Sequence, residues 1–154
     1  MTYVLGPRSL IQLAGVNPDL VRVVQRAIAR SMQDFSVHEG LRSKAQQAKN
    51  VAAGVSRTQA SRHLTGHAVD LVPWIGGVLR WEWPAIYPIA AAMREASIGE
   101  RVPIRWGGVW DRKLSELGRS PDELKAAVAA YAARHPGPDL LDGPHFELSK
   151  GDYP

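Results

Sequence analysis

The sequence predicts an α+β fold in which helices pack against a small antiparallel sheet. Apolar residues between positions 17 and 32 recur at helical spacing. Residues 34–40 instead alternate apolar and polar side chains, as a half-buried strand does. Gly76-Gly77 separates two short apolar segments, which is typical of the turn in a β-hairpin. Helical and strand-like segments are therefore mixed along the chain, and antiparallel neighbours are expected.

In the first half of the chain, the residue types at Asn17-Pro18 indicate the start of a helix. Asn17 is a typical N-cap, and Pro18 suits the first helical position, where its missing N–H costs no hydrogen bond. Residues 1–16 carry no such signal and are expected to be extended or irregular. The predicted elements are a lead-in, a helix, a strand, a helix stopped by Gly54, a polar loop and a strand: 1–16, 17–32, 34–40, 43–53, 55–66 and 68–72.

The second half has a stronger helix start at Ser120. Pro121 follows it, and Glu123 completes the capping-box pattern three residues after Ser120. Gly99 is expected to end the preceding helix, and Gly107-Gly108 to form a turn. The predicted elements are a hairpin strand, a helix, a strand, a helix and a closing strand: 78–81, 84–97, 102–106, 120–134 and 146–148.

Length and composition indicate a single globular domain spanning residues 1–154, with no interdomain linker. Hydrophobic residues make up 45% and charged residues 22%, as in an ordinary soluble chain rather than a disordered one. No apolar run approaches the roughly 18 residues that a membrane-spanning helix needs, so membrane insertion is not expected. The N-terminus lacks a charged start followed by an apolar stretch, and no secretory signal is expected.

Charge and cysteine content limit the classes of partner and of metal or catalytic site that the chain can have. The formal net charge of +4 suits either a mildly basic soluble protein or attraction to a polyanion such as an anionic cell wall. The charges are scattered, without a run of five or six, so nucleic-acid binding has no specific support. The chain contains no cysteine, which excludes disulfides, thiolate metal sites and cysteine nucleophiles. A metal site would have to use histidine and carboxylate.

The segment 61–70, Ser-Arg-His-Leu-Thr-Gly-His-Ala-Val-Asp, concentrates metal-binding side chains. His63 and Asp70 offer one nitrogen and one oxygen, and a catalytic zinc takes three such protein ligands plus water. The best third ligand is His145, in a second histidine segment. The alternative is that these are unrelated surface residues. We predict Zn2+ bound by His63, Asp70 and His145.

His67 is a rival ligand, four residues after His63. That spacing binds metal on a helix, but Gly66 and the β-branched neighbours disfavour a helix here. A tight turn or a positive φ at Gly66 would instead let the loop enter a strand. His67 is therefore expected beside the site or on the surface.

Asp142 lies three residues before His145 and is the candidate catalytic base. A carboxylate beside a metal site can take a proton from water and pass it to a leaving amine. The alternative is a turn-forming aspartate in Asp-Gly-Pro. Arg42 and Ser61 are candidate substrate contacts. Arg42 could bind a substrate carboxylate or stabilise an oxyanion, and Ser61 could bond to a substrate carboxylate or carbonyl. The alternatives are that Arg42 is a solvated arginine and Ser61 an ordinary loop serine.

The remaining polar and aromatic candidates are less specific. Three further residues are expected to be structural: His38, His135 and Glu147. Five tryptophans either line a groove for a glycan or peptide or belong to the core and its edge: Trp74, Trp81, Trp83, Trp106 and Trp110.

The patterns Ser61-x-His63-x-x-Gly66-x-Ala68-x-Asp70 and Asp142-x-x-His145 resemble those of a family of zinc peptidases. The family includes VanY-type D-alanyl-D-alanine carboxypeptidases and phage L-alanyl-D-glutamate endolysins. Segments 39–42, 104–108 and 143–148 are similar to its phage branch. The resemblance implies a fold shared with the Hedgehog signalling domain and zinc on the three predicted ligands. It also implies Asp142 as the general base, Arg42 and Ser61 as substrate contacts, and the peptide stem of peptidoglycan as the substrate.

A phage endolysin of this kind is expected to be a monomer. It would be made in the host cytoplasm without a signal peptide and act on the cell wall after a separate protein has permeabilised the membrane. Two alternatives stay open. One is a D-alanyl-D-alanine carboxypeptidase, which needs a closed pocket for the free carboxylate. The other is a wall-binding or structural zinc domain without catalysis.

The sequence departs from the phage pattern at two places. Val109 stands where relatives have an aspartate after the Trp-Gly-Gly turn, and Asp111 is a candidate substitute. Some thirty residues, about 111–139, are inserted before Asp142. This insertion is expected to be a lid or a wall-binding addition.

Overall fold

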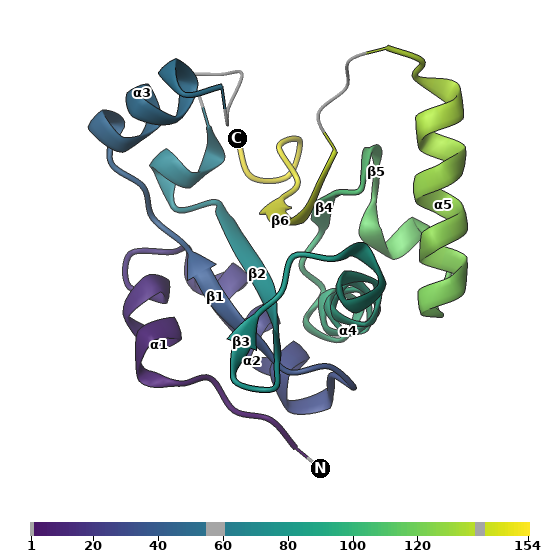
Figure 1. Ribbon diagram of the computed structural model, residues 1–154, viewed down its shortest axis with the longest axis horizontal. Helices are drawn as coiled ribbons and strands as arrows, with labels where there is room; N and C mark the ends of the chain where they lie inside the picture. The colour runs from purple at the N-terminus through teal and green to yellow at the C-terminus, as the bar shows by residue number, and fades with distance from the viewer. Residues whose placement is uncertain (1, 55–60, 138–140) are drawn as a thin grey trace.

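The computed structural model describes residues 2–54, 61–137 and 141–154 (Figure 1). The predicted α+β class is confirmed, because helices pack against one antiparallel sheet. The α-helices are α1 (Pro7–Leu13), α2 (Pro18–Arg30), α3 (Lys44–Ala52), α4 (Trp83–Glu100) and α5 (Pro121–Arg134). The strands are β1 (Phe35–Glu39), β2 (Ala68–Ile75), β3 (Val78–Leu79), β4 (Ile104–Gly107), β5 (Val109–Lys113) and β6 (Asp142–Leu148). Two 3-10 turns, η1 (Arg62–Thr65) and η2 (Leu114–Glu116), precede β2 and α5.

The sheet has the order β1-β2-β6-β4-β5, with β3 folded back on β2, and every pairing is antiparallel. The last strand, β6, is inserted between β2 and β4, at the centre of the sheet. Successive side chains of a strand point to opposite faces. One face of β2 and β6 therefore belongs to the core, and the other carries Asp70, Trp74, His145 and Glu147. We call this second face the site face.

The core lies on the opposite face of the sheet, under α2 and α4. Its largest fully buried side chains include Leu20 of α2, Met93 of α4, and Trp106 and Phe146 of the sheet. The rings of Trp106 and Phe146 stack with 6.2 Å between their centroids. The helices and the core thus support the sheet from one side and leave the site face available for chemistry.

The expectation that residues 1–16 are irregular is wrong, because α1 forms within them. Pro7 stands in its first turn, and Leu13 is buried. The Ser9 hydroxyl accepts a hydrogen bond of 2.9 Å from the backbone N–H of Val37 in β1. A helix of this length is too short for hydrophobic periodicity to be evident, and its stability comes from covering the edge of β1.

The predicted end of the third long helix at Gly99 is also wrong. The helix α4 continues to Glu100 and ends at Arg101, which takes a left-handed conformation with φ 58°. Gly99 has another role, since a Cβ there would lie only 2.6 Å from the Arg26 guanidinium. Arg26 donates a hydrogen bond of 2.9 Å to Glu100, so this glycine lets α2 and α4 approach each other.

Most other predicted elements are confirmed, with three differences. The helices α2, α3 and α5 and the Gly76-Gly77 hairpin form as expected, and Ser120 accepts a hydrogen bond from Glu123 N–H. The predicted polar loop 55–66 contains η1, while residues 55–60 lie outside the described part of the chain. The strand β5 was not predicted, because the sequence signal there was a turn followed by charged residues. The strand β6 begins at Asp142, four residues earlier than expected, because pairing with β2 and β4 overrides the Asp-Gly-Pro turn signal.

The region predicted as an insertion contains η2 and α5 in its described part. Leu124, Val128 and Tyr131 of α5 are buried, and α5 packs beside α4 and β5. Within the described residues, no helix combines the length and the apolar character that crossing a bilayer requires.

Candidate metal centre

The pairing of β2 with β6 brings the two predicted ligand segments together. Asp70 and His145 are direct cross-strand partners in this antiparallel pair. Side chains of such partners lie on the same face, with their Cβ atoms about 5 Å apart. The sheet register alone therefore places the second ligand beside the third, although 75 residues separate them in the chain.

The 3-10 turn η1 places His63 beside this pair. The Ser61 hydroxyl accepts a hydrogen bond of 3.3 Å from His63 N–H at the start of the turn. Gly66 ends the turn in a left-handed conformation with φ 73°, as the sequence predicted. A Cβ at Gly66 would lie 2.5 Å from the carbonyl oxygen of Gly15, so only glycine fits there.

His63, Asp70 and His145 form a compact cluster on the site face. Asp70 Oδ1 lies 3.2 Å from His63 Nε2 and 3.4 Å from His145 Nδ1. One donor atom from each of the three residues lies within 4.8 Å of the others. Both imidazoles are buried, whereas the Asp70 carboxylate is partly exposed. The structure thus brings together all three residues that the sequence predicted as ligands.

The outer nitrogen of each imidazole is held by a hydrogen bond. His63 Nδ1–H donates to the carbonyl oxygen of Gly40 over 2.8 Å. His145 Nε2–H donates to Glu147 Oε1 over 2.9 Å. These bonds fix the tautomer of each ring and direct the other nitrogen toward Asp70. A metal-binding histidine is typically oriented in this way.

Glu147 was expected to be structural, and its contact with His145 was not predicted from the sequence. Its side chain is 4% exposed, and its second oxygen accepts a hydrogen bond of 3.1 Å from Arg105. Arg62 adds an ion pair at 3.7 Å. The signal was its position two residues after His145 in a strand, which puts both side chains on one face.

The electrostatics of the cluster reflect these contacts. Burial disfavours a charged Asp70, but hydrogen bonds from His145 and His63 outweigh it and lower the pKa of Asp70. Burial likewise opposes a charged His145, yet its contacts with Asp70 and Glu147 raise its pKa to about 10. For Glu147, burial is again outweighed, and the hydrogen bond with His145 lowers its pKa. A cation is favoured between these carboxylates, either a proton on the imidazole or a metal ion.

Asp142 lies at the start of β6, beside the cluster. Burial and the nearby Asp70 charge raise the pKa of Asp142, while His145 and His63 oppose this shift. Asp142 pairs with Gly107 of β4, where a Cβ would lie 2.1 Å from the Asp142 carbonyl oxygen. The Trp-Gly-Gly segment therefore allows β4 to approach the backbone that carries Asp142.

Arg42 also acts on this site, although its side chain is largely occupied. It donates hydrogen bonds to the side chains of Glu39 and Gln47, and its backbone N–H donates to the carbonyl oxygen of His63 over 2.9 Å. Its positive charge weakly opposes the rise in the pKa of Asp142. The predicted substrate contact is thus near the site and tied to β1 and α3.

The other candidates have separate positions. His67 Nδ1 contacts the Thr65 hydroxyl at 2.6 Å and lies outside the cluster. Asp111 forms an ion pair with Arg134 of α5 at 2.9 Å rather than joining the cluster. As its neighbour in β5, Trp110 points toward His145, so Asp111 points to the other face of the sheet. Trp110 lies against His145, with 5.3 Å between ring centroids.

The remaining tryptophans divide between the two alternatives considered from the sequence. Trp106 is fully buried in the core, and Trp83 packs against it with 6.3 Å between ring centroids. Trp74 and Trp81 are exposed on the β2–β3 hairpin side of the sheet.

The donor set of the cluster fits zinc. Two imidazole nitrogens and one carboxylate oxygen are ligands of catalytic zinc sites. Donors held tetrahedrally at about 2.0–2.2 Å from zinc lie roughly 3.3–3.6 Å apart. The observed separations of 3.2 and 3.4 Å from Asp70 Oδ1 are close to this range. Both separations from Asp70 Oδ1 thus suit a zinc ion held by His63 Nε2, Asp70 Oδ1 and His145 Nδ1, and all three donor atoms lie within 4.8 Å of one another.

Comparison with known proteins agrees with the geometry. Residues 1–149 match the family model described as phage L-alanyl-D-glutamate peptidase. The L-alanyl-D-glutamate peptidase of Escherichia phage T5 is 32% identical over 152 residues, covering 96% of this chain and 99% of that protein. The peptidase of the same name from Listeria phage A118 is 32% identical over 93 residues, covering 55% of this chain and 32% of that protein.

A solved structure is similar over nearly the whole chain. The crystal structure of the Serratia marcescens L-Ala D-Glu endopeptidase ChiX matches with a TM-score of 0.75 and 41% sequence identity. The match covers 98% of this chain and 94% of that chain. The extent of the family match, together with the His–Asp–His cluster, supports the resemblance inferred from the sequence motifs. The chain belongs to the phage L-alanyl-D-glutamate peptidase family.

Proposed function

We propose that this protein is a zinc-dependent endopeptidase that hydrolyses the L-alanyl-D-glutamate bond in the peptide stem of peptidoglycan. The observation that carries the proposal is the cluster of His63, Asp70 and His145 with Asp142 beside it, in a chain of this family. His63, Asp70 and His145 would hold the ion. When bound, zinc supplies Lewis-acid chemistry that polarises a carbonyl and makes water more acidic.

Asp142 is proposed as the general base. Its largely buried carboxylate and raised pKa suit a group that takes a proton from water and gives it to the leaving amine. The nearby imidazoles and Arg42 act against this rise in the pKa of Asp142. Glu147 acts on the chemistry only through His145, which it orients by the hydrogen bond of 2.9 Å.

Arg42 and Ser61 are proposed as substrate contacts. Arg42 provides a fixed positive charge near Asp142, where negative charge develops on the scissile carbonyl oxygen. Its bonds to Glu39 and Gln47 hold the guanidinium in place and reduce the reorganisation needed during the reaction. The Ser61 oxygen accepts from His63 N–H, and its hydroxyl hydrogen can donate to a substrate carbonyl.

The biological setting follows from the proposed reaction. We propose a monomeric single-domain endolysin whose partner is the peptidoglycan stem, made in the host cytoplasm. It would reach the cell wall after a separate protein permeabilises the membrane.

The experiment that tests this function is digestion of purified peptidoglycan, followed by mass analysis of the new chain ends. New L-alanine carboxyl ends and D-glutamate amino ends, lost with a chelator and restored by zinc, are expected. Release of free D-alanine would instead indicate a carboxypeptidase. If zinc-loaded, folded protein gave no products on walls from several bacteria, the chain would be a binding domain.

A further inference from the structure

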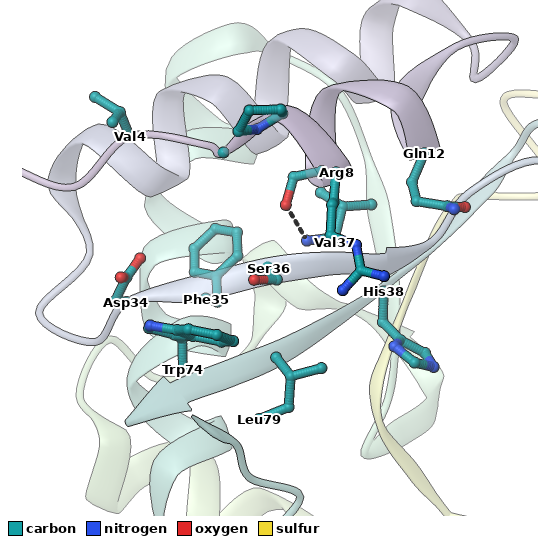
Figure 2. Close-up of a pocket in the computed structure, with 13 residues that line it drawn as sticks. Val4, Arg8, Gln12, Asp34, Phe35, Ser36, Val37, His38, Trp74 and Leu79 are labelled. Atoms are coloured by element: carbon teal, nitrogen blue, oxygen red, sulfur yellow. Dashed lines mark hydrogen bonds between the residues drawn. The ribbon is translucent and has the colours of Figure 1, made fainter. Parts of the chain in front are cut away.

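A cavity of about 530 Å3 lies between α1, β1 and the β2–β3 hairpin, apart from the His–Asp–His cluster (Figure 2). We call it the hairpin cavity. It is lined by Arg8 and Gln12 of α1, by Asp34, Ser36 and His38 at β1, and by Trp74 and Leu79 of the hairpin, among others. Its volume is in the range of small-molecule binding sites, about 300–1,000 Å3. The metal centre does not use any of these side chains.

Part of the lining of the hairpin cavity lies on the same face of the sheet as the metal centre. Every second residue of a strand points to the same face, so Asp70, Val72 and Trp74 of β2 share one face. Ser36 pairs with Val72 across the β1–β2 ladder and shares that face. Four residues of strand separate Asp70 from Trp74, a distance of about 13 Å. A single extended substrate can therefore reach both places.

The lining combines an aromatic surface with polar groups that lack partners. Trp74 is 41% exposed. Among the described residues, no hydrogen bond or ion pair uses the side chains of Arg8, Gln12, Asp34 or Ser36. The Asp34 backbone carbonyl is engaged by Gln33 and Trp74, but its carboxylate is not. Donors and acceptors that surround an aromatic ring suit a ligand with an apolar face and a polar rim.

Sugar rings have this character. The C–H groups on one face of a pyranose pack on an indole ring, while hydroxyl and acetamido groups around its edge make hydrogen bonds. In peptidoglycan the L-alanine of the stem is joined directly to the lactyl group of an amino sugar. A peptidase that cuts after this L-alanine, the function proposed above, must hold its scissile bond within one residue of the glycan strand.

We propose that the hairpin cavity is a glycan subsite, which binds the amino-sugar strand that carries the stem being cut. Trp74 packs against a sugar ring, and Arg8, Asp34 and Ser36 bond to its polar substituents. The link between this subsite and the bond that is cut rests on the proposed function. The suitability of the cavity for a sugar rests only on its lining residues. It predicts that the sugar contributes to recognition separately from the peptide.

The test compares two substrates that differ only in the glycan. One is the disaccharide-tetrapeptide, GlcNAc-MurNAc on the stem. The other is the same tetrapeptide N-acylated with lactic acid, which preserves the amide bond to L-alanine. Wild-type protein is expected to cleave the first with roughly tenfold higher kcat/KM, a contribution of the size that one aromatic contact makes. Trp74→Ala and Asp34→Ala are expected to lose most of this preference and to cleave the lactoyl-tetrapeptide at the wild-type rate.

Ile75→Ala is the matched control. Ile75 neighbours Trp74 in β2 and is equally exposed at 41%, but it points to the other face and does not line the cavity. It should keep the full preference for the disaccharide-tetrapeptide. Thermal unfolding of each variant separates a lost contact from a lost fold, and Asp34→Ala removes only a side chain without a structural bond.

The proposal is overturned if wild-type protein cleaves both substrates equally well, or if Trp74→Ala and Asp34→Ala lower both rates alike. The second result would indicate that the cavity holds part of the peptide. A peptide-free oligomer of GlcNAc-MurNAc, titrated into the protein and followed by NMR shifts of cavity residues, keeps this test independent of catalysis. Sugar binding at Trp74 without cleavage of either substrate would refute the proposed function and retain the subsite. Absence of shifts would refute the subsite.

Discussion

The two ends of the site face differ in how their polar groups are satisfied. At the metal centre, each histidine is held on its outer side, by Gly40 or by Glu147, and faces Asp70 on the other. At the hairpin cavity, Arg8 and Asp34 line an open surface without side-chain partners among the described residues. The first arrangement is built to keep a fixed geometry, and the second to accept a ligand that supplies the missing bonds.

This difference has a physical origin in burial. Buried imidazoles and carboxylates must be paired, because an unsatisfied buried polar group is costly. The metal centre lies at the middle of the sheet, between β2 and β6, where such pairing is obligatory. The hairpin cavity lies at the β1 edge of the sheet, where polar groups are less buried and do not need a protein partner. Loss of a predicted ligand at the centre should therefore affect metal binding, stability and rate together, whereas changes at the cavity should affect only recognition.

The largest effect is expected for His145→Ala. Loss of this ring removes one predicted ligand and breaks the buried hydrogen bond between His145 and Glu147, and breaking a buried charged pair costs on the order of 3–5 kcal/mol. The variant should lose zinc, activity and thermal stability together, as measured by metal content, peptidoglycan digestion and melting. His135→Ala, at the end of α5, is the control and should keep all three. Retained zinc stoichiometry in His145→Ala would show that the cluster is not the ligand set.

Asp142→Ala separates catalysis from metal binding within the metal centre. Removal of a general base should lower kcat by about 10²–10⁴-fold, while the three ligands remain in place. Zinc content and melting temperature are expected to stay close to wild type. An equal loss of metal and activity would reassign Asp142 to metal binding.

Glu147→Gln tests the hydrogen bond behind His145. Loss of the carboxylate that orients a metal-binding histidine typically weakens metal affinity by about 10–100-fold. The expected result is weaker zinc binding in competition with a chelator, with activity recovered at excess zinc. Glu82→Gln, on the surface at the start of α4, is the matched control. Unchanged affinity would mean that Glu147 serves only its ion pairs with Arg105 and Arg62.

Zinc affinity should rise with pH. The pKa of His145 is about 10 in the metal-free protein, so the ring carries a proton at pH 6–8 that must leave when the metal binds. Affinity is then expected to increase by about tenfold per pH unit in this interval, because binding releases one proton. Chelator competition at pH 6, 7 and 8 measures the slope. A flat profile would show that His145 is neutral before the metal arrives.

The smallest effects are expected at the hairpin cavity. Asp34→Ala should change the free energy of unfolding by no more than about 0.5 kcal/mol, as for other surface substitutions. Its zinc affinity should equal that of wild type, since it makes no contact with the metal centre. Chemical denaturation and chelator competition are the measurements. A linked change in zinc affinity would contradict the separation of the two ends.

Some elements could be predicted from local sequence alone, and others could not. Ser120 and Asn17 identified α5 and α2, because capping is a local property of a few neighbouring residues. The helix α1 was missed because its stability depends on β1, which is distant in the sequence. Gly99 was misassigned for a related reason, since its role depends on Arg26 of another helix.

The metal centre shows the same division. His63, Asp70 and His145 could be named from residue types and family motifs, because ligand chemistry restricts which side chains can serve. Glu147 could not be distinguished from a structural glutamate before β6 was known to begin at Asp142 and to carry it beside His145. The hairpin cavity depends on three elements, α1, β1 and the hairpin, and one of them was not predicted at all.

The sequence by itself determined the fold class, most helices, the three candidate ligands and the candidate base, because local periodicity, capping and ligand chemistry are encoded in short segments. The tertiary structure alone decided the order of the strands, the register of Asp70 against His145, and the hydrogen bonds that hold the outer nitrogens of the histidines. It also decided that Trp106 lies in the core while Trp74 lines a cavity. These features depend on which segments pair across long stretches of chain, and that choice is made by the burial of the whole core.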